Sequence, residues 1–219
     1  MPQPKVTLFA LLAGVLMATF QLLRPWGDIS EDPQSMAEAF ADTRWVIAHL
    51  AGAASFVMLA ALARVAAVAS SAKTGTGRPT RVAGIAQVAM ATGAALVLPY
   101  YGAETFALHE LGRAFLGGAS LDIFGLSTGT RMNPAAIALF GVGLLLIAVA
   151  GVCLSLARVR GGTAWWSAWP LGVLVAFALP QFALPPAGRV AYGVAFLIAA
   201  IVFAVSRPAK HRAAARAAG

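Results

Sequence analysis

The sequence has few charged residues and a single cysteine. Only 11% of its 219 residues are charged, whereas soluble domains carry about 25%. Cys153 lies inside an apolar stretch, so the chain can form no intrachain disulfide and has no zinc site of the Cys-x-x-Cys or Cys/His kind. We expect Cys153 to be a small buried apolar residue. These absences exclude a disulfide-stapled secreted domain and argue against an ordinary water-soluble fold.

Acidic residues are missing from every long apolar stretch. All eight fall in two segments, the first with Asp28, Glu31, Asp32, Glu38 and Asp42 and the second with Glu104, Glu110 and Asp122. Ionisable residues in the middle of membrane helices commonly mark proton relays and ion pathways. Because no Asp, Glu or Lys stands in the middle of an apolar stretch, the sequence argues against a proton- or sodium-coupled transporter.

Long apolar stretches dominate what is present, since 60% of the residues are hydrophobic. A crossing of about 30 Å of hydrocarbon needs about 20 apolar residues, and six stretches meet this, at residues 6–23, 45–63, 82–99, 134–157, 164–184 and 187–206. Each is expected to be a helix, because lipid offers no partner to backbone polar groups. The sequence therefore predicts an all-α integral membrane protein, one transmembrane domain over residues 1–219, with its first helix retained rather than cleaved.

Basic residues give the orientation. With a cytoplasmic N-terminus, five fall outside and eleven inside, the latter being Lys5, Arg64, Lys73, Arg78, Arg81, Arg158, Arg160, Arg207, Lys210, Arg212 and Arg216. Lys and Arg resist translocation, so both termini are expected in the cytoplasm of a bacterial inner membrane. The net charge of +8 does not indicate nucleic-acid binding, because the basic residues cluster at helix ends. Trp26 and Trp45 are expected to belong to an aromatic belt at the membrane surface.

Two longer segments, residues 24–44 and 100–133, are expected on the extracytoplasmic side. In the first, Asp32 followed by Pro33 predicts the start of a short surface helix. In the second, residues 103–116 have helical spacing and Gly117–Gly118 ends it. Loops of this length are often functional, and this one is treated as a lid over the bundle. The basic tail Arg207–Gly219 is expected to anchor the topology on the inner side.

Candidate site residues lie near this outer face. His49 stands about 6 Å inside the second stretch at 1.5 Å per residue, and Glu104, His109 and Glu110 lie in the lid. The modest interpretation is a histidine bonded to a neighbouring helix and a solvated helix face with a local ion pair. The sharper one is a ligand site made by His49, Glu104, His109 and Glu110, in which His49 and His109 hold haem b or a divalent metal. It requires a turn near Pro99–Gly102.

Two further motifs are weaker. Gly125-Leu126-Ser127-Thr128-Gly129 matches the G-x-S-x-G nucleophile pattern, which has meaning only between a strand and a helix. Pro180 is expected to kink the fifth stretch. No motif names a reaction, so the chain is expected not to be an enzyme.

Two functions remain open from the sequence. The first is a non-enzymatic membrane protein that binds a small ligand, haem or a divalent metal at its extracytoplasmic face under the 100–133 lid. The alternative is a small transporter or an accessory subunit that packs against other membrane subunits and holds no cofactor. In both, the lipid bilayer is the main partner.

Overall fold

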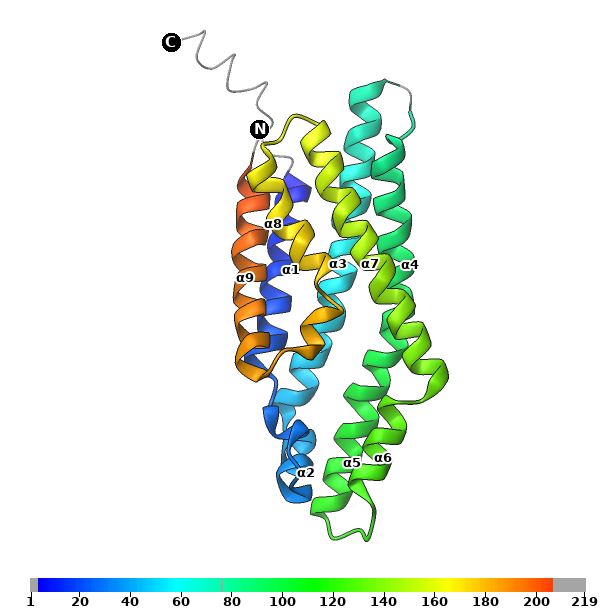
Figure 1. Ribbon diagram of the computed structural model, residues 1–219, viewed down its shortest axis with the longest axis vertical. Helices are drawn as coiled ribbons and strands as arrows, with labels where there is room; N and C mark the ends of the chain where they lie inside the picture. Colours follow the sequence, from blue (N-terminus) through cyan, green and yellow to red (C-terminus); the bar gives the residue numbers. More distant parts are fainter. Residues whose placement is uncertain (1–3, 76, 207–219) are drawn as a thin grey trace.

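The computed structural model describes residues 4–75 and 77–206, and every regular element in that part is helical (Figure 1). The tail at 207–219, with four of the basic residues assigned to the inner side, lies outside the described residues. The helices in chain order are α1 (Pro4–Leu23), η1 (Trp26–Ile29), α2 (Pro33–Ala41), α3 (Thr43–Thr74), α4 (Arg81–Gly102), η2 (Ala103–Ala107), α5 (Leu108–Leu116), α6 (Ile123–Arg131), α7 (Pro134–Arg160), α8 (Trp165–Ala176), η3 (Pro180–Ala183) and α9 (Pro186–Val205).

Five of the helical segments are long and apolar enough to cross a membrane: Pro4–Leu23, Thr43–Ala72, Arg81–Leu116, Pro134–Arg160 and Pro186–Val205. In each of these segments, at most half of the most apolar 18 residues are buried inside the protein. Large apolar side chains such as Val88, Leu145 and Ile198 point outward and are more than half exposed. A chain with such faces needs an apolar surrounding, so this is a multi-pass membrane protein.

The fifth predicted stretch, residues 164–184, differs from expectation. It is not one long helix but α8, of 12 residues, followed by a turn and the short 3-10 helix η3. Pro170 stands inside α8 and Pro180 begins η3, and proline removes a backbone donor and crowds the preceding turn. Six uninterrupted spans are therefore not found among the described residues.

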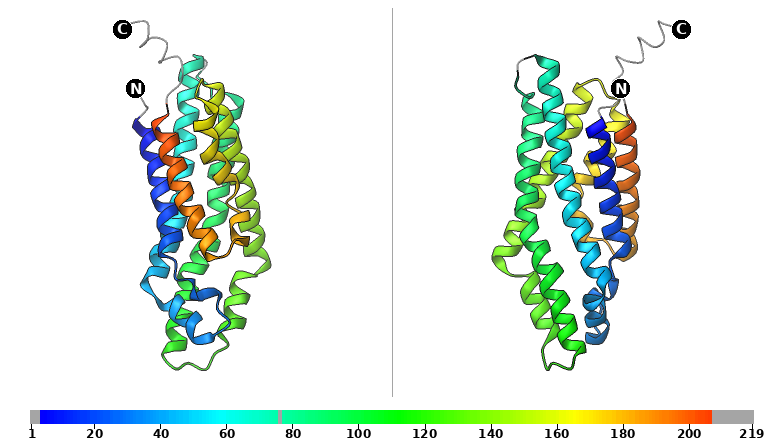
Figure 2. Two further views of the ribbon diagram at one scale, coloured as in Figure 1. Left: turned by 60° about the vertical axis from the view of Figure 1, so that its left-hand side comes forward. Right: turned by 180° about the vertical axis from the view of Figure 1, so that it is seen from behind.

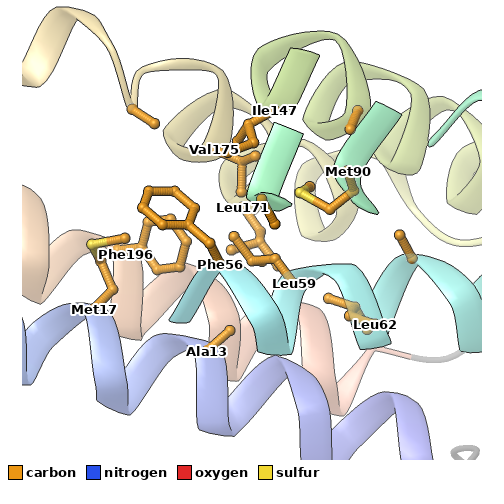
Figure 3. Close-up of a cluster of buried hydrophobic side chains, with 14 of the residues drawn as sticks. Ala13, Met17, Phe56, Leu59, Leu62, Met90, Ile147, Leu171, Val175 and Phe196 are labelled. Atoms are coloured by element: carbon orange, nitrogen blue, oxygen red, sulfur yellow. The ribbon is translucent and has the colours of Figure 1, made fainter. Parts of the chain in front are cut away.

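The bundle is held together by close contacts between helices at small residues. Its core joins residues from α1, α3, α4, α7, α8 and α9, among them Met17, Phe56, Met90, Ile147 and Phe196 (Figure 3). A Cβ added to Gly93 of α4 would lie 2.6 Å from the Gly143 oxygen of α7. Thr7 Oγ1 donates to the Ala204 oxygen at 3.2 Å, so the start of α1 and the end of α9 lie at the same end of the bundle.

The opposite end carries a small second core. Residues 26–41 and 103–131, called here the end cap, extend beyond the ends of α1 and α9 (Figures 1 and 2). This second core consists of buried apolar side chains from the cap that pack against Trp45 of α3, namely Met36, Phe40, Leu108 and Ile123. Asp32 caps α2 by accepting from Ser35 N at 2.9 Å, so the helix predicted after Asp32–Pro33 is present.

The turn predicted near Pro99–Gly102 is absent. The chain instead continues from α4 through η2, a π-helical segment, into α5. The N–H of Ala103 donates to both the Pro99 and the Tyr100 oxygens, so the helix continues without a break from α4 into η2. The helix ends at Gly117, as predicted, and Gly118 turns the chain with a positive φ of 88° that favours glycine. The α5–α6 hairpin therefore extends the bundle and does not fold back over it.

Candidate ligand site in the buried polar layer

Four charged side chains are buried where the end cap meets the bundle. Arg24 follows α1, Asp28 lies in η1, Glu104 in η2, and Arg131 ends α6. Their side chains are 5%, 0%, 9% and 20% exposed, respectively. Charged side chains are rarely buried unless they are paired. With His49, these residues are called here the polar layer.

The charges form one continuous chain of ion pairs. Asp28 Oδ2 accepts from Arg24 Nη2 at 2.5 Å and from Arg131 Nη2 at 2.8 Å. Arg131 Nε then donates to Glu104 Oε1 at 2.8 Å. Two arginines and two carboxylates leave the layer with no net charge when His49 is neutral. The network ties α6 and η2 of the cap to the end of α1.

Opposite effects act on the pKa of Asp28. Burial, the largest single effect, would raise it, but the charges and hydrogen bonds of Arg24 and Arg131 outweigh burial, and the pKa lies below its usual value. For Arg24, burial would lower the pKa, but Asp28 and Glu104 outweigh it, and the pKa is raised. Both residues are therefore charged at neutral pH.

Aromatic rings enclose the arginines. The Arg24 guanidinium lies 5.2 Å from the ring centroid of Trp26 and 5.3 Å from that of Trp45, and Arg131 lies 5.3 Å from the Phe40 ring. Trp45 is fully buried and its Nε1 donates to the Glu104 oxygen at 3.0 Å. Its assignment to a belt at the membrane surface is therefore wrong, because cap residues cover it. The rings exclude water and strengthen the ion pairs.

His49 completes the layer from α3. Its Nδ1 lies 2.7 Å from the Trp45 oxygen, and a carbonyl oxygen can only accept, so Nδ1 carries the proton. In the neutral ring, Nε2 is then a bare acceptor. It is fully buried, has no hydrogen-bond partner among the described residues, and faces Glu104 Oε2 at 3.7 Å. A single hydrogen-bond donor group lying beside both acceptors would satisfy the two together.

Two more polar atoms of the layer are also unsatisfied within the described part of the chain, namely Arg24 Nε and Asp28 Oδ1. A buried polar atom without a partner costs about 1–3 kcal/mol. Such atoms in a folded protein commonly indicate a bound water, ion or ligand. The layer thus offers one donor and several acceptors to a small polar group.

The other predicted site residues lie elsewhere. His109 Nδ1 lies 2.8 Å from the Phe40 oxygen, where it joins α5 to α2. Glu110 is exposed and pairs with Arg113 at 3.3 Å. Of the four predicted residues, the structure thus brings together His49 and Glu104 and gives His109 and Glu110 other partners. In residues 4–75 and 77–206, no group of three or more His, Cys, Asp or Glu side chains is placed to hold a metal ion.

Ser127 does not stand in a nucleophile elbow. The G-x-S-x-G segment forms the first turns of α6, which Asp122 caps by accepting from Gly125 N at 2.9 Å. The Ser127 hydroxyl is buried, donates to the Phe124 oxygen at 3.1 Å and lies against Met36. Nothing around it corresponds to the strand-turn-helix context that this motif needs.

An open groove of about 490 Å³ lies between η2 and the α6–α7 junction. It is lined by Ala103, Gly125, Leu126, Gly129, Thr130, Asn133 and Ala136. None of the five residues of the polar layer lines it, so the groove lies on the surface of the cap and is separate from the buried charges.

In the sequence, Arg24 and Arg131 are only two of the five basic residues expected on the outer side, and Asp28 is only one of the eight acidic residues. The i,i+4 spacing of Arg24 and Asp28 at the end of an apolar stretch was a usable signal for a local ion pair. The contact of Arg131 with Glu104 spans 27 residues, and no local pattern announces it. Comparison with protein-family models, curated proteins and solved structures finds no match to this chain.

Proposed function

We propose that the chain is a bacterial inner-membrane protein of non-enzymatic type that binds a small polar ligand in the polar layer, at its extracytoplasmic end. The observation that carries the proposal is the buried, unpartnered Nε2 of His49 facing Glu104 Oε2 at 3.7 Å. A group that donates to both atoms would satisfy them together.

The orientation is supported by the fold. The start of α1 and the end of α9 share one end of the bundle, which needs an even number of crossings. Five long helices alone would give an odd number, so we propose α8 and η3 together as the sixth crossing. Their run from the end of α7 to the start of α9 supports this assignment. The excess of basic residues at the opposite end from the cap supports a cytoplasmic location for both termini.

Reporters fused at two positions test this topology. One fused at Gly75, between α3 and α4, is expected to read cytoplasmic, and one fused at Ser120, between α5 and α6, is expected to read extracytoplasmic. If the two readouts were exchanged, the polar layer would lie at the cytoplasmic end and the ligand would come from the cell interior.

The chemistry of the ligand follows from charge. The layer already balances two arginines with two carboxylates, so a divalent cation would add two uncompensated charges near Arg24 and Arg131. An axial haem site would need both histidines together, but His109 lies in the contact between α5 and α2 and is not among the residues of the polar layer. A small molecule bearing a hydroxyl or amine group can donate to His49 Nε2 and Glu104 Oε2, and the two arginines repel it less than they would repel a divalent cation.

Thermal unfolding of the purified protein with ethanolamine, glycerol or Zn²⁺ tests the site. We expect ethanolamine and glycerol to raise the unfolding temperature of the wild type and Zn²⁺ to leave it unchanged. His49→Phe keeps an aromatic ring against Phe20 and Trp45 but removes Nε2, so it should lose the response. His109→Phe is the matched control and should keep it. If none of the three probes stabilised the wild type, an accessory subunit without a ligand would replace this proposal.

A further inference from the structure

A second concave surface lies at the other end of the molecule, between α8 and α9. This groove of about 410 Å³ is lined by Trp166, Pro170 and Leu174 of α8 and by Ala195, Ile198 and Val202 of α9. Its walls are almost entirely apolar. At Leu174 the two helices are joined, because the Tyr192 hydroxyl donates to the Leu174 oxygen at 3.0 Å. The groove therefore runs from this hydrogen bond toward the end of the bundle where α8 begins.

Two arginines lie at the end of α7, near the end of the bundle where α8 begins. Arg158 Nη2 donates to the backbone oxygen of Phe203 at 2.9 Å, and Phe203 directly follows Val202 of the groove wall. The Nε of Arg158 is buried and has no hydrogen-bond partner in the part of the chain that the structure describes. Arg160 is exposed at the end of α7, six residues before Trp166. Trp165 and Trp166 are 68% and 54% exposed there. Tryptophans in this position are typical of the membrane surface.

No carboxylate within residues 4–75 and 77–206 pairs with these arginines. All eight acidic side chains lie between positions 28 and 122, in the end cap or next to it, and every ion pair of the described residues is at or near that end. Within the described residues, these two arginines are therefore left without a counter-anion. Basic pockets between membrane helices on the cytoplasmic side bind anionic lipid headgroups.

We propose that the groove between α8 and α9 holds one acyl chain of an anionic phospholipid, whose phosphate is bound by Arg158 and Arg160. The chain lies against the apolar walls between Trp166 and Leu174, and the headgroup lies at the membrane surface beside the two tryptophans. Pro170, which stands inside α8, is part of the groove wall. This site is separate from the polar layer and does not depend on a ligand there.

Native mass spectrometry of the detergent-purified full chain tests the proposal with phosphatidylglycerol and phosphatidylcholine of identical acyl chains. We expect phosphatidylglycerol to bind more tightly, with one molecule retained per protein. Arg160→Gln should weaken phosphatidylglycerol about fivefold, the effect of about 1 kcal/mol per basic residue, and leave phosphatidylcholine unchanged. Arg64→Gln removes an exposed arginine remote from the groove and is the matched control.

A second pair of variants tests the groove itself. Ala195→Phe fills it and should weaken the binding of both lipids, whereas Ala138→Phe, on an exposed face of α7, should not. Equal binding of the two lipids by the wild type, or equal effects within either pair of variants, would overturn the proposal. So would a dimer that dissociates in Ala195→Phe, because a second copy of the chain would then be the occupant.

Discussion

The bundle core and the polar layer are stabilised in opposite ways. In the bundle core, helices approach at glycine and alanine, and the contacts are mostly apolar and spread over six helices, with single neutral hydrogen bonds such as that from Ser55 to the Ala13 oxygen. In the polar layer, four charged side chains and one histidine make a few directional contacts at one level. Lipid tails are as apolar as leucine, so helices in a bilayer gain from close packing rather than from hydrophobic burial. The cap has only a small apolar core of its own.

The difference indicates what each region contributes. Small residues let the six helices of the bundle associate closely without ion pairs between them. The ion pairs then fix the cap to that bundle at one defined level, because Asp28 and Arg131 meet there from segments 103 residues apart. Breaking the two regions separately should therefore give different kinds of damage.

The largest effect is expected in the polar layer, from Asp28→Asn. This change leaves Arg24 and Arg131 buried without their shared carboxylate, and removing one partner of a buried ion pair costs about 3–5 kcal/mol. Equilibrium unfolding in mixed micelles measures it. A loss of unfolding free energy below about 1 kcal/mol would mean that the charges are hydrated and that the polar layer does not hold the cap to the bundle.

In the bundle core, Gly93→Leu should be the most damaging change. Its side chain would meet the Gly143 oxygen and Ile147 of α7, and overpacking of this kind costs typically about 1–3 kcal/mol. Gly141→Ala, whose added Cβ meets nothing within 4 Å, is the control and should change the unfolding free energy by less than about 0.5 kcal/mol. Equal losses in the two variants would contradict close packing of α4 on α7.

Acid should weaken the polar layer before the bundle core. The pKa of Asp28 is lower in the folded chain than its ordinary value of 3.8, so the unfolded chain takes up the proton first as pH falls. The Asp28 carboxylate therefore stabilises the folded chain above about pH 4. This stabilisation is lost as the pH falls further and passes through the pKa that Asp28 has in the folded chain. Unfolding midpoints at pH 6, 4 and 3 should fall for the wild type.

The raised pKa of Arg24 gives no effect in this range, because it stays protonated far above neutral pH. Between pH 6 and pH 3, the unfolding midpoint of Asp28→Asn should therefore fall less steeply than that of the wild type. An equally steep fall in both proteins would show that other carboxylates control the acid dependence of stability.

The smallest effect is expected from Glu110→Gln. Glu110 and Arg113 form an exposed pair at 3.3 Å, with side chains 68% and 63% exposed, and pairs of this kind contribute about 0–1 kcal/mol. The same unfolding assay should place this variant within about 0.5 kcal/mol of the wild type. A larger loss would mean that the cap relies on surface charges as well as on the buried layer.

Much of the fold could be predicted from the sequence, because apolar length and helix caps act locally. The helix after Asp32–Pro33 and the end of α5 at Gly117 follow from residues within a few positions. The continuation through Pro99 could not be predicted, since Pro99 and Gly102 usually favour a turn but here lie within α4, which runs on into the π-helical segment η2. The interruption at residues 177–179 was foreseen as a kink at Pro180, but not as the end of a helix.

Less of the candidate site could be predicted. His49 and Glu104 attract attention as polar residues near an apolar boundary, but their approach depends on η2 rotating Glu104 toward α3. Arg131 joins them only through the α5–α6 hairpin, a contact across 27 residues. Long-range pairs of this kind leave no periodic trace in a single sequence.

The protonation state of His49 tests the polar layer most directly. Nitrogen-15 NMR of the protein labelled at histidine reports whether each ring nitrogen carries a proton, a lone pair or a bound group. We expect His49 to show a protonated Nδ1 and an unprotonated Nε2 at pH 7, with the Nε2 resonance shifting when ethanolamine is added. A protonated Nε2 in the free protein, unchanged by ethanolamine, would make His49 the cation of a closed ion pair with Glu104 and would contradict a ligand site.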